Sequence, residues 1–141
     1  MRVKRGQAGV EYVILTGILL FFFIPLVHYS MQETTNAVRN SQLDSYVSRL
    51  SKAVDAVHSV GPGTTEIIIV TVPNGVKSAK LINVQGGISE IVLEAEFFGG
   101  ISDIHASVKP LIHGDIPNTP GTYHLRVKGM NESSINISWG G

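Results

Sequence analysis

Apolar and polar positions divide the first 60 residues of the chain into two patterns. Residues 8–29 form an apolar run whose only formal charge is a glutamate. Farther on, apolar residues recur every three or four positions, which places them on one face of a helix. The residues of this stripe are Leu43, Tyr46, Val47, Leu50, Ala53, Val54, Val57 and Val60. Gly61-Pro62-Gly63 is a stop signal, so we expect one helix over residues 7–60, apolar all round in 7–30 and amphipathic in 31–60.

After residue 64 the period of the pattern changes to two, which is typical of β-strands. Residues 66–72 are β-branched almost throughout and predict a strand covered on both faces. Further strands are predicted over 76–84, 88–98, 101–108, 123–128 and 134–139. Residues 109–121 hold three prolines and two glycines and predict a loop, for which a crossing between two sheets is one course. The expected fold class is α+β: a long N-terminal helix followed by a small antiparallel sheet or sandwich, a head domain over 64–141 that packs on the helical stripe.

The apolar run is long enough to span a membrane. At about 1.5 Å per residue, 22 residues reach about 33 Å, against a hydrocarbon core of about 30 Å. Residues 1–6 carry three positive side chains and no negative one, which predicts a cytoplasmic N-terminus and an exported C-terminal part. Pro25 lies inside the run and predicts a kink in the helix. The small residues of a secretory cleavage site do not follow the run; Gly6 and Gly9 stand before it or at its start.

A carboxylate in this run needs an explanation. An ionised Glu11 would cost about 2.5 kcal/mol or more at the bilayer centre and less near the interface. One interpretation is that Glu11 lies shallow and reaches water. The other is that it needs a cationic partner inside the membrane.

The sequence Lys4-Arg5-Gly6-Gln7-Ala8-Gly9-Val10-Glu11-Tyr12, followed by the apolar run, resembles the class III signal peptide of archaeal type IV pilins. The resemblance covers about 30 residues. It implies that a prepilin peptidase cuts between Gly6 and Gln7, removes residues 1–6 and leaves the apolar run in place. It further implies a helical homopolymer with the helices in its core and the β heads outside, assembled by a membrane platform and an ATPase. Adhesion is the expected role of such a surface filament.

The same resemblance implies that Glu11, fifth residue of the processed chain, sets the register between subunits. Cleavage would create an ammonium group at Gln7, in the same membrane region as Glu11 of a neighbouring copy. Two unit charges about 4 Å apart attract by roughly 4 kcal/mol at an effective dielectric constant near 20. If Gln7 cyclises to pyroglutamate the charge is lost, and Glu11 would bond backbone amides instead.

Composition narrows the remaining classes of function. Eleven positive and eleven negative side chains give a net charge of zero, which argues against charge-driven binding of nucleic acid. Removal of residues 1–6 would leave eight positive and eleven negative side chains, a balance of −3. The chain has no cysteine, which excludes disulfides, cysteine-based zinc sites and thiol catalysis.

Candidate catalytic and metal-binding patterns are weak. Glu90, Glu94 and Glu96 could suggest acid–base chemistry or a calcium site, but alternating glutamates are more typical of the solvated face of a strand. The five histidines lack the spacing of metal ligands. The chain also lacks a G-x-S-x-G nucleophile turn and a phosphate-binding glycine loop. We therefore expect neither enzymatic activity nor a cofactor.

Two surface features of the expected head remain. His124, Arg126 and Lys128 form a basic stripe, for which a solvated strand face is favoured over contact with an acidic surface. Asn131-Glu-Ser133 and Asn136-Ile-Ser138 are glycosylation sequons, which matter because the domain is expected to be exported.

A filament subunit has one main rival among the possible functions. A membrane-anchored binding module, or a minor pilin-like adhesin that never polymerises, would share the N-terminal pattern. An exported hydrolase is disfavoured, because the sequence offers no nucleophile–base constellation. An archaellin is less favoured than a pilin, because the N-terminus has the form Gln-x-x-x-Glu-Tyr. In either favoured reading the precursor lies in the cell membrane with its C-terminal domain outside.

Overall fold

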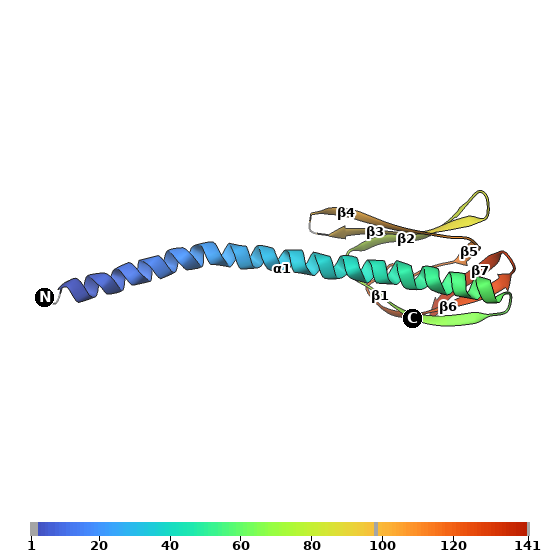
Figure 1. Cartoon of the computed structure of the whole chain (residues 1–141), viewed down its shortest axis with the longest axis horizontal. Helices are drawn as coiled ribbons and strands as arrows, with labels where there is room; N and C mark the ends of the chain where they lie inside the picture. The colour runs from blue at the N-terminus through green and yellow to red at the C-terminus, as the bar shows by residue number, and fades with distance from the viewer. Residues whose placement is uncertain (1–2, 98, 141) are drawn as a thin grey trace. The chain divides into compact units, whose positions relative to one another are not determined.

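The structure is a computed structural model that describes residues 3–97 and 99–140, with side chains from residue 6 onward. One long N-terminal apolar helix, α1 (Val3–Val60), is followed by two β-sheets, which confirms the α+β class (Figure 1). The chain forms two compact units, Met1–Ala37 and Val38–Gly141. The unit boundary falls within α1, so the second part of the helix belongs with the sheets.

In the first unit, α1 continues through Pro25 without a break. The backbone of proline has no N–H group, so one helical hydrogen bond is missing there. Whether α1 bends at this point stays a prediction. The hydroxyl of Thr16 donates to the carbonyl of Tyr12 at 2.8 Å, which gives a polar group in the apolar run a partner within its own helix.

The described residues of the second unit form seven strands. They are β1 Thr65–Val72, β2 Val76–Val84, β3 Ile88–Phe97, β4 Gly100–Val108, β5 Leu111–Gly114, β6 Gly121–Asn131 and β7 Ser134–Gly140. Sheet A has the strand order β1-β6-β7-β5 and sheet B the order β2-β3-β4. Neighbouring strands are antiparallel except β5 and β7, which are parallel. The six predicted strands are confirmed, with ends that differ from the predicted ones by at most a few residues. Phe98, predicted as the last residue of the third strand, lies outside the described residues.

The predicted loop over 109–121 contains β5, so that part of the prediction is wrong. The strand has only four residues and stands between Pro110 and Pro117. Such a short segment is too brief for alternation to be recognised among turn-forming residues. The segment does carry the chain from sheet B to sheet A, as a crossing between sheets requires.

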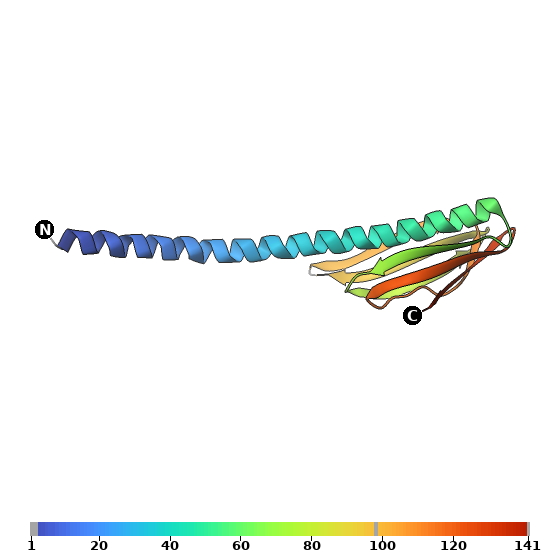
Figure 2. The ribbon, with the colours of Figure 1, turned by 90° about the horizontal axis from the view of Figure 1, so that it is seen from below.

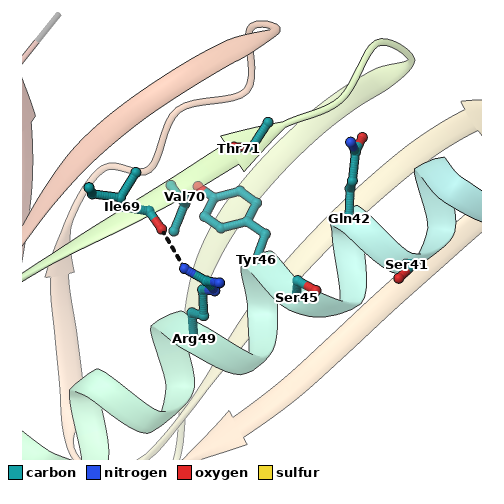
Figure 3. Close-up of a pocket in the computed structure, with 8 residues that line it drawn as sticks. All are labelled: Ser41, Gln42, Ser45, Tyr46, Arg49, Ile69, Val70 and Thr71. Carbon is teal, nitrogen blue, oxygen red and sulfur yellow. Dashed lines mark hydrogen bonds between the residues drawn. The ribbon is translucent and has the colours of Figure 1, made fainter.

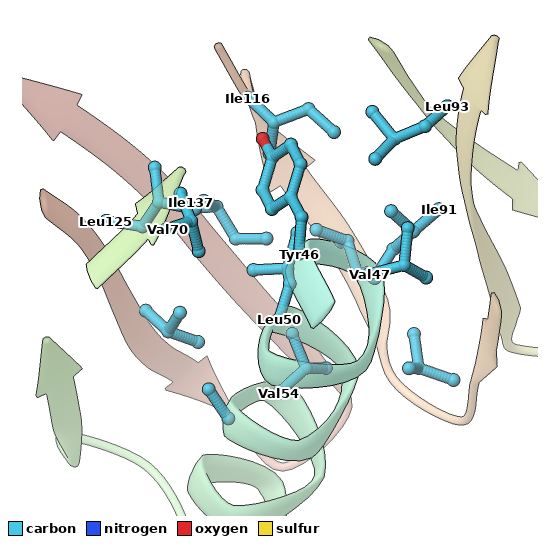
Figure 4. Close-up of a cluster of buried hydrophobic side chains, with 14 of the residues drawn as sticks. Tyr46, Val47, Leu50, Val54, Val70, Ile91, Leu93, Ile116, Leu125 and Ile137 are labelled. Atoms are coloured by element: carbon cyan, nitrogen blue, oxygen red, sulfur yellow. The ribbon is translucent and has the colours of Figure 1, made fainter. Parts of the chain in front are cut away.

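The helical stripe packs against both sheets, where the sequence predicted contact with one face of a small sheet or sandwich. Seven of its eight residues are buried, and only Val60, at the end of α1, is 74% exposed. Figure 4 shows Tyr46, Leu50 and neighbouring side chains between residues of sheet A and residues of sheet B. Val70, Leu125 and Ile137 come from sheet A, and Ile91 and Leu93 come from sheet B. A stripe with two residues per turn is wide enough to serve two layers.

β1 is not covered on both faces as predicted. Ile67 is 60% and Ile69 50% exposed, whereas Val70 and Val72 on the other face are buried. β1 is also one of the two edge strands of sheet A (Figure 2). A continuous β-branched run therefore marks a strand here without telling how many of its faces are covered.

A side-chain amide joins the two sheets. Asn83 of β2 donates from Nδ2 to the carbonyl of Ile112 in β5, and its Oδ1 accepts from the N–H of Ile112, each at 3.1 Å. The amide thus bonds Ile112 as a neighbouring peptide would in a ladder. Ser89, fully buried, donates to Asn83 Oδ1 at 2.6 Å and accepts from the Ile112 N–H at 3.1 Å. These bonds fix the line along which sheets A and B meet.

Candidate functional site

The N-terminal part of α1 presents an apolar surface on every side. Between residues 10 and 31 the large apolar side chains are 43% to 76% exposed. By length and composition, the helix Gly6–Val60 is able to cross a membrane, which is compatible with membrane anchoring. Leu15, Ile18, Leu19, Phe22, Phe23 and Leu26 line a shallow apolar hollow on one of its faces. Full burial of such a side chain stabilises a complex by about 1.5–3 kcal/mol.

The structure brings the predicted register residues together on one helix face. Gln7 and Glu11 are four positions apart in α1 and therefore lie one turn from each other. Both are exposed. Glu11 forms no hydrogen bond or ion pair with any residue that the structure describes. The carboxylate is thus free to bind a group from outside the chain.

The predicted cleavage bond, Gly6–Gln7, lies in the second turn of α1. An added Cβ at Gly6 would meet nothing among the described atoms within 4 Å, so the bond is accessible. Glycine disfavours the helix by about 1 kcal/mol relative to alanine, which eases the local unwinding that a peptidase needs.

The apolar surface ends in a polar turn of the same helix. His28 and Gln32 approach within 3.0 Å through His28 Nε2 and Gln32 Nε2. The hydroxyls of Thr34 and Thr35 donate to helix carbonyls one turn earlier, at 2.9 Å each. Tyr29, 67% exposed, stands where interfacial aromatic residues stand in membrane helices.

On the outer face of sheet A the predicted basic stripe is exposed. His124, Arg126 and Lys128 alternate along β6 with buried residues. The register sets Arg126 opposite Ile67 and His124 opposite Ile69, the two exposed isoleucines of β1. Basic and aliphatic groups therefore share this face.

On the outer face of sheet B the three glutamates of β3 lie in one row. Lys77 Nζ contacts Glu96 Oε2 at 2.7 Å, and this hydrogen-bonded ion pair raises the pKa of Lys77 and lowers that of Glu96. Glu94 accepts a hydrogen bond from the hydroxyl of Ser78 at 3.1 Å. Over the described part of the chain, no group of three or more histidine, aspartate or glutamate residues is placed to hold a metal ion.

A groove of about 240 Å³ runs between α1 and the free edge of β1 (Figure 3). Arg49 Nη1 donates to the carbonyl of Ile69 at 3.3 Å and so occupies one of the edge carbonyls that β6 does not use. Tyr46 Oη donates to the carbonyl of Pro117 at 3.2 Å, and burial, with a smaller contribution from Tyr123, raises the pKa of this phenol well above its ordinary value. The residues that line the groove include no nucleophile–base pair, and Arg49 covers part of the β1 edge.

The two sequons differ in accessibility. Asn131 is exposed at the end of β6, and its Oδ1 accepts from the backbone N–H of Ser133 at 3.0 Å and from the Ser133 hydroxyl at 3.3 Å. Asn136 is half-buried in β7, between Lys128 and His113 of the neighbouring strands. Asn131 is therefore the more accessible acceptor.

No protein-family model, curated protein or solved structure matches the chain. The candidate site therefore rests on sequence and geometry. Two features of the second unit escaped sequence reasoning, the Arg49 contact to the β1 edge and the Asn83 bond between sheets. Neither has a local signal, because each depends on which strand becomes an edge.

Proposed function

We propose that this chain is the structural subunit of an archaeal type IV pilus-like surface filament. The observation that carries the proposal is the apolar, exposed N-terminal part of α1, which continues into a helix segment buried among two β-sheets. An apolar side chain in this N-terminal part of α1 is stabilised by burial only where lipid or another helix covers it. In the proposed filament, helices of many copies cover one another.

The proposal gives Glu11 a defined partner. In the filament its carboxylate pairs with the N-terminal ammonium of a neighbouring copy, and this pair sets the axial register of the subunits. The lack of a partner for Glu11 among the described residues supports an intermolecular one. Leaving either charge unpaired in the apolar core costs several kcal/mol, so each docked copy favours the next.

Maturation and location follow the resemblance of the N-terminus. The precursor lies in the cell membrane with the β domain outside, prepilin peptidase cleaves between Gly6 and Gln7, and the membrane platform and ATPase assemble the filament. The resulting filament is extracellular and serves adhesion. Glycan on Asn131 would face solvent.

The N-terminal residue of the protein recovered from cells tests this proposal. Mass spectrometry of surface material sheared from cells should give a chain that begins at Gln7, free or cyclised, and electron microscopy of the same material should give filaments. An intact Met1-to-Gly6 segment in native protein would refute the proposal.

The same experiment separates the main rival, a membrane-anchored binding module or minor pilin-like adhesin. Such a protein would also be recovered with residues 1–6 removed, but it would stay with the membranes. Sheared material without filaments, alongside processed chain in the membrane fraction, would favour the rival.

A further inference from the structure

The outer face of sheet A carries positive charge. Its outward strand positions include Arg126 and Lys128, joined by His124 on the same strand and His113 on β5. None of the described outward positions on β1, β5, β6 and β7 is a carboxylate. We refer to this surface as the basic face.

The outer face of sheet B carries negative charge. Its outward carboxylates are Glu90, Glu94, Glu96 and Asp103. Lys77 pairs with Glu96, and Lys80 and His105 also lie at outward positions, so the described carboxylates of this surface outnumber its lysines by four to two. Glu94 stands directly opposite Asp103 in the β3–β4 register, an unfavourable arrangement of like charges, and neither forms an ion pair with a described residue. We refer to this surface as the acidic face.

Both faces also expose aliphatic side chains among the charges. The basic face has Ile67 and Ile69, 60% and 50% exposed. The acidic face has Ile82, Ile88 and Ile101, 42%, 47% and 69% exposed. A mixture of apolar contact area and complementary charge is the usual make-up of a specific protein interface.

We propose that the basic face of one copy docks on the acidic face of a second copy. The inference rests on the proposed function for its setting, a filament of identical chains, and adds an interface between heads to the one between helices. Arg126 and Lys128 then supply cations to the opposed carboxylates Glu94 and Asp103, neither of which forms an ion pair with a described residue of its own chain. The contact is heterologous, because two different surfaces meet, and a docked pair of copies still has one basic and one acidic face free. Such a contact propagates along a row of copies.

Charge reversal with rescue tests the docking in the full-length chain. Because the chain has no cysteine, Ser138→Cys on the basic face and Ser107→Cys on the acidic face provide unique attachment points for a flexible bis-maleimide linker. Cells that express both cysteine variants together should give linked pairs, whereas either variant alone should give few. The variants R126E/K128E and E94K/D103K should each lower the yield of linked pairs by about tenfold or more.

The chain that carries both reversals should recover linking, because its faces are again complementary. Lys109→Glu and Asp115→Lys, charge reversals at exposed loop positions, serve as controls that should leave linking unchanged. The neutral variant R126Q/K128Q keeps polar side chains on the strand and removes only the charges, so it should weaken linking and leave the fold intact. Circular dichroism checks that each variant is folded. Linking that is unaffected by reversal, or not recovered in the combined chain, would overturn the inference.

The outcomes distinguish this inference from the proposed function. Filaments of normal number and form in both reversal variants would refute head docking and leave the filament proposal intact. Linked pairs on membranes of cells that form no filaments would keep head docking and refute the filament proposal. Reversal that changes only attachment to other cells, with linking intact, would assign the two faces to a foreign partner.

Discussion

At the scale of single residues, Glu11 is the group whose environment and chemistry agree least. It is a carboxylate in a helix segment whose other side chains from residue 8 to 29 carry no formal charge. A shallow position at the interface would lower the cost of the charge but give it no role. A partner ammonium in another copy would make the same charge a condition for assembly.

Replacing Glu11 with glutamine separates these two interpretations. Glutamine keeps the size and hydrogen-bonding capacity but removes the charge, so the chain should still enter the membrane and lose residues 1–6. The number of filaments per cell should fall about tenfold or more, since the lost attraction is worth up to about 4 kcal/mol and 1.4 kcal/mol corresponds to tenfold. Glu33→Gln, an exposed position beyond the apolar run, is the matched control. Filaments per cell are counted in electron micrographs. Equal numbers in the two variants would refute the register role of Glu11.

Asn83 is the second residue whose role depends on a distant part of the chain. Its amide makes two hydrogen bonds to the backbone of Ile112 and accepts a third from Ser89. Asn83→Ala would remove both Asn83 bonds between the sheets and the bond that Ser89 donates within sheet B, while the Ile112 N–H keeps its bond to Ser89. The free energy of unfolding should fall by about 2–4 kcal/mol, from lost bonds and incompletely satisfied buried groups. Chemical unfolding of the detergent-solubilised chain measures this, with Asn118→Ala in an exposed loop as control. Equal midpoints for the two variants would contradict the role of Asn83.

At the scale of elements, sequence periodicity was sufficient wherever a segment was long. The stripe from Leu43 to Val57 became the buried face of α1, and six strands of alternating pattern formed as predicted. Periodicity failed for β5, whose four residues give only two repeats of the strand period. It also failed for the outer face of β1, because exposure of Ile67 depends on the neighbours of the strand and not on its own residues.

Tertiary arrangement also explains which parts of the candidate sites were predictable. The apolar run and Glu11 are local features of the sequence, so their position on α1 could be predicted. The basic stripe on β6 and the glutamates on β3 were visible as alternation within one strand, but the complete faces could not be predicted, because they also depend on how the strands pair. Glu94 meets Asp103 only through the register of β3 with β4. Gly114 is a similar case: its φ of 102° and the carbonyl of Ile137, which an added Cβ would overlap, both follow from the pairing of β5 with β7.

At the scale of the whole molecule, the two units have opposite relations to their surroundings. The described side chains between residues 10 and 31 are almost all exposed and mostly apolar, so this part needs lipid or other helices. The buried cluster of the second unit lies entirely between Leu43 and Ile137 and needs nothing from residues 1–37. Membrane association and folding of the β domain should therefore be separable.

A chain reduced to residues 31–141 tests this separation. It keeps the complete buried cluster and loses the apolar run, so it should stay in the soluble fraction and unfold in one cooperative transition. Leu50→Ala in the shortened chain should lower the free energy of unfolding by about 2–5 kcal/mol, because Leu50 is fully buried against both sheets. Val60→Ala, at the exposed end of α1, should change it by less than about 0.5 kcal/mol. Circular dichroism during urea titration measures all three chains. A shortened chain that is unfolded or insoluble would show that the β domain depends on the apolar helix for its fold and not only for its location.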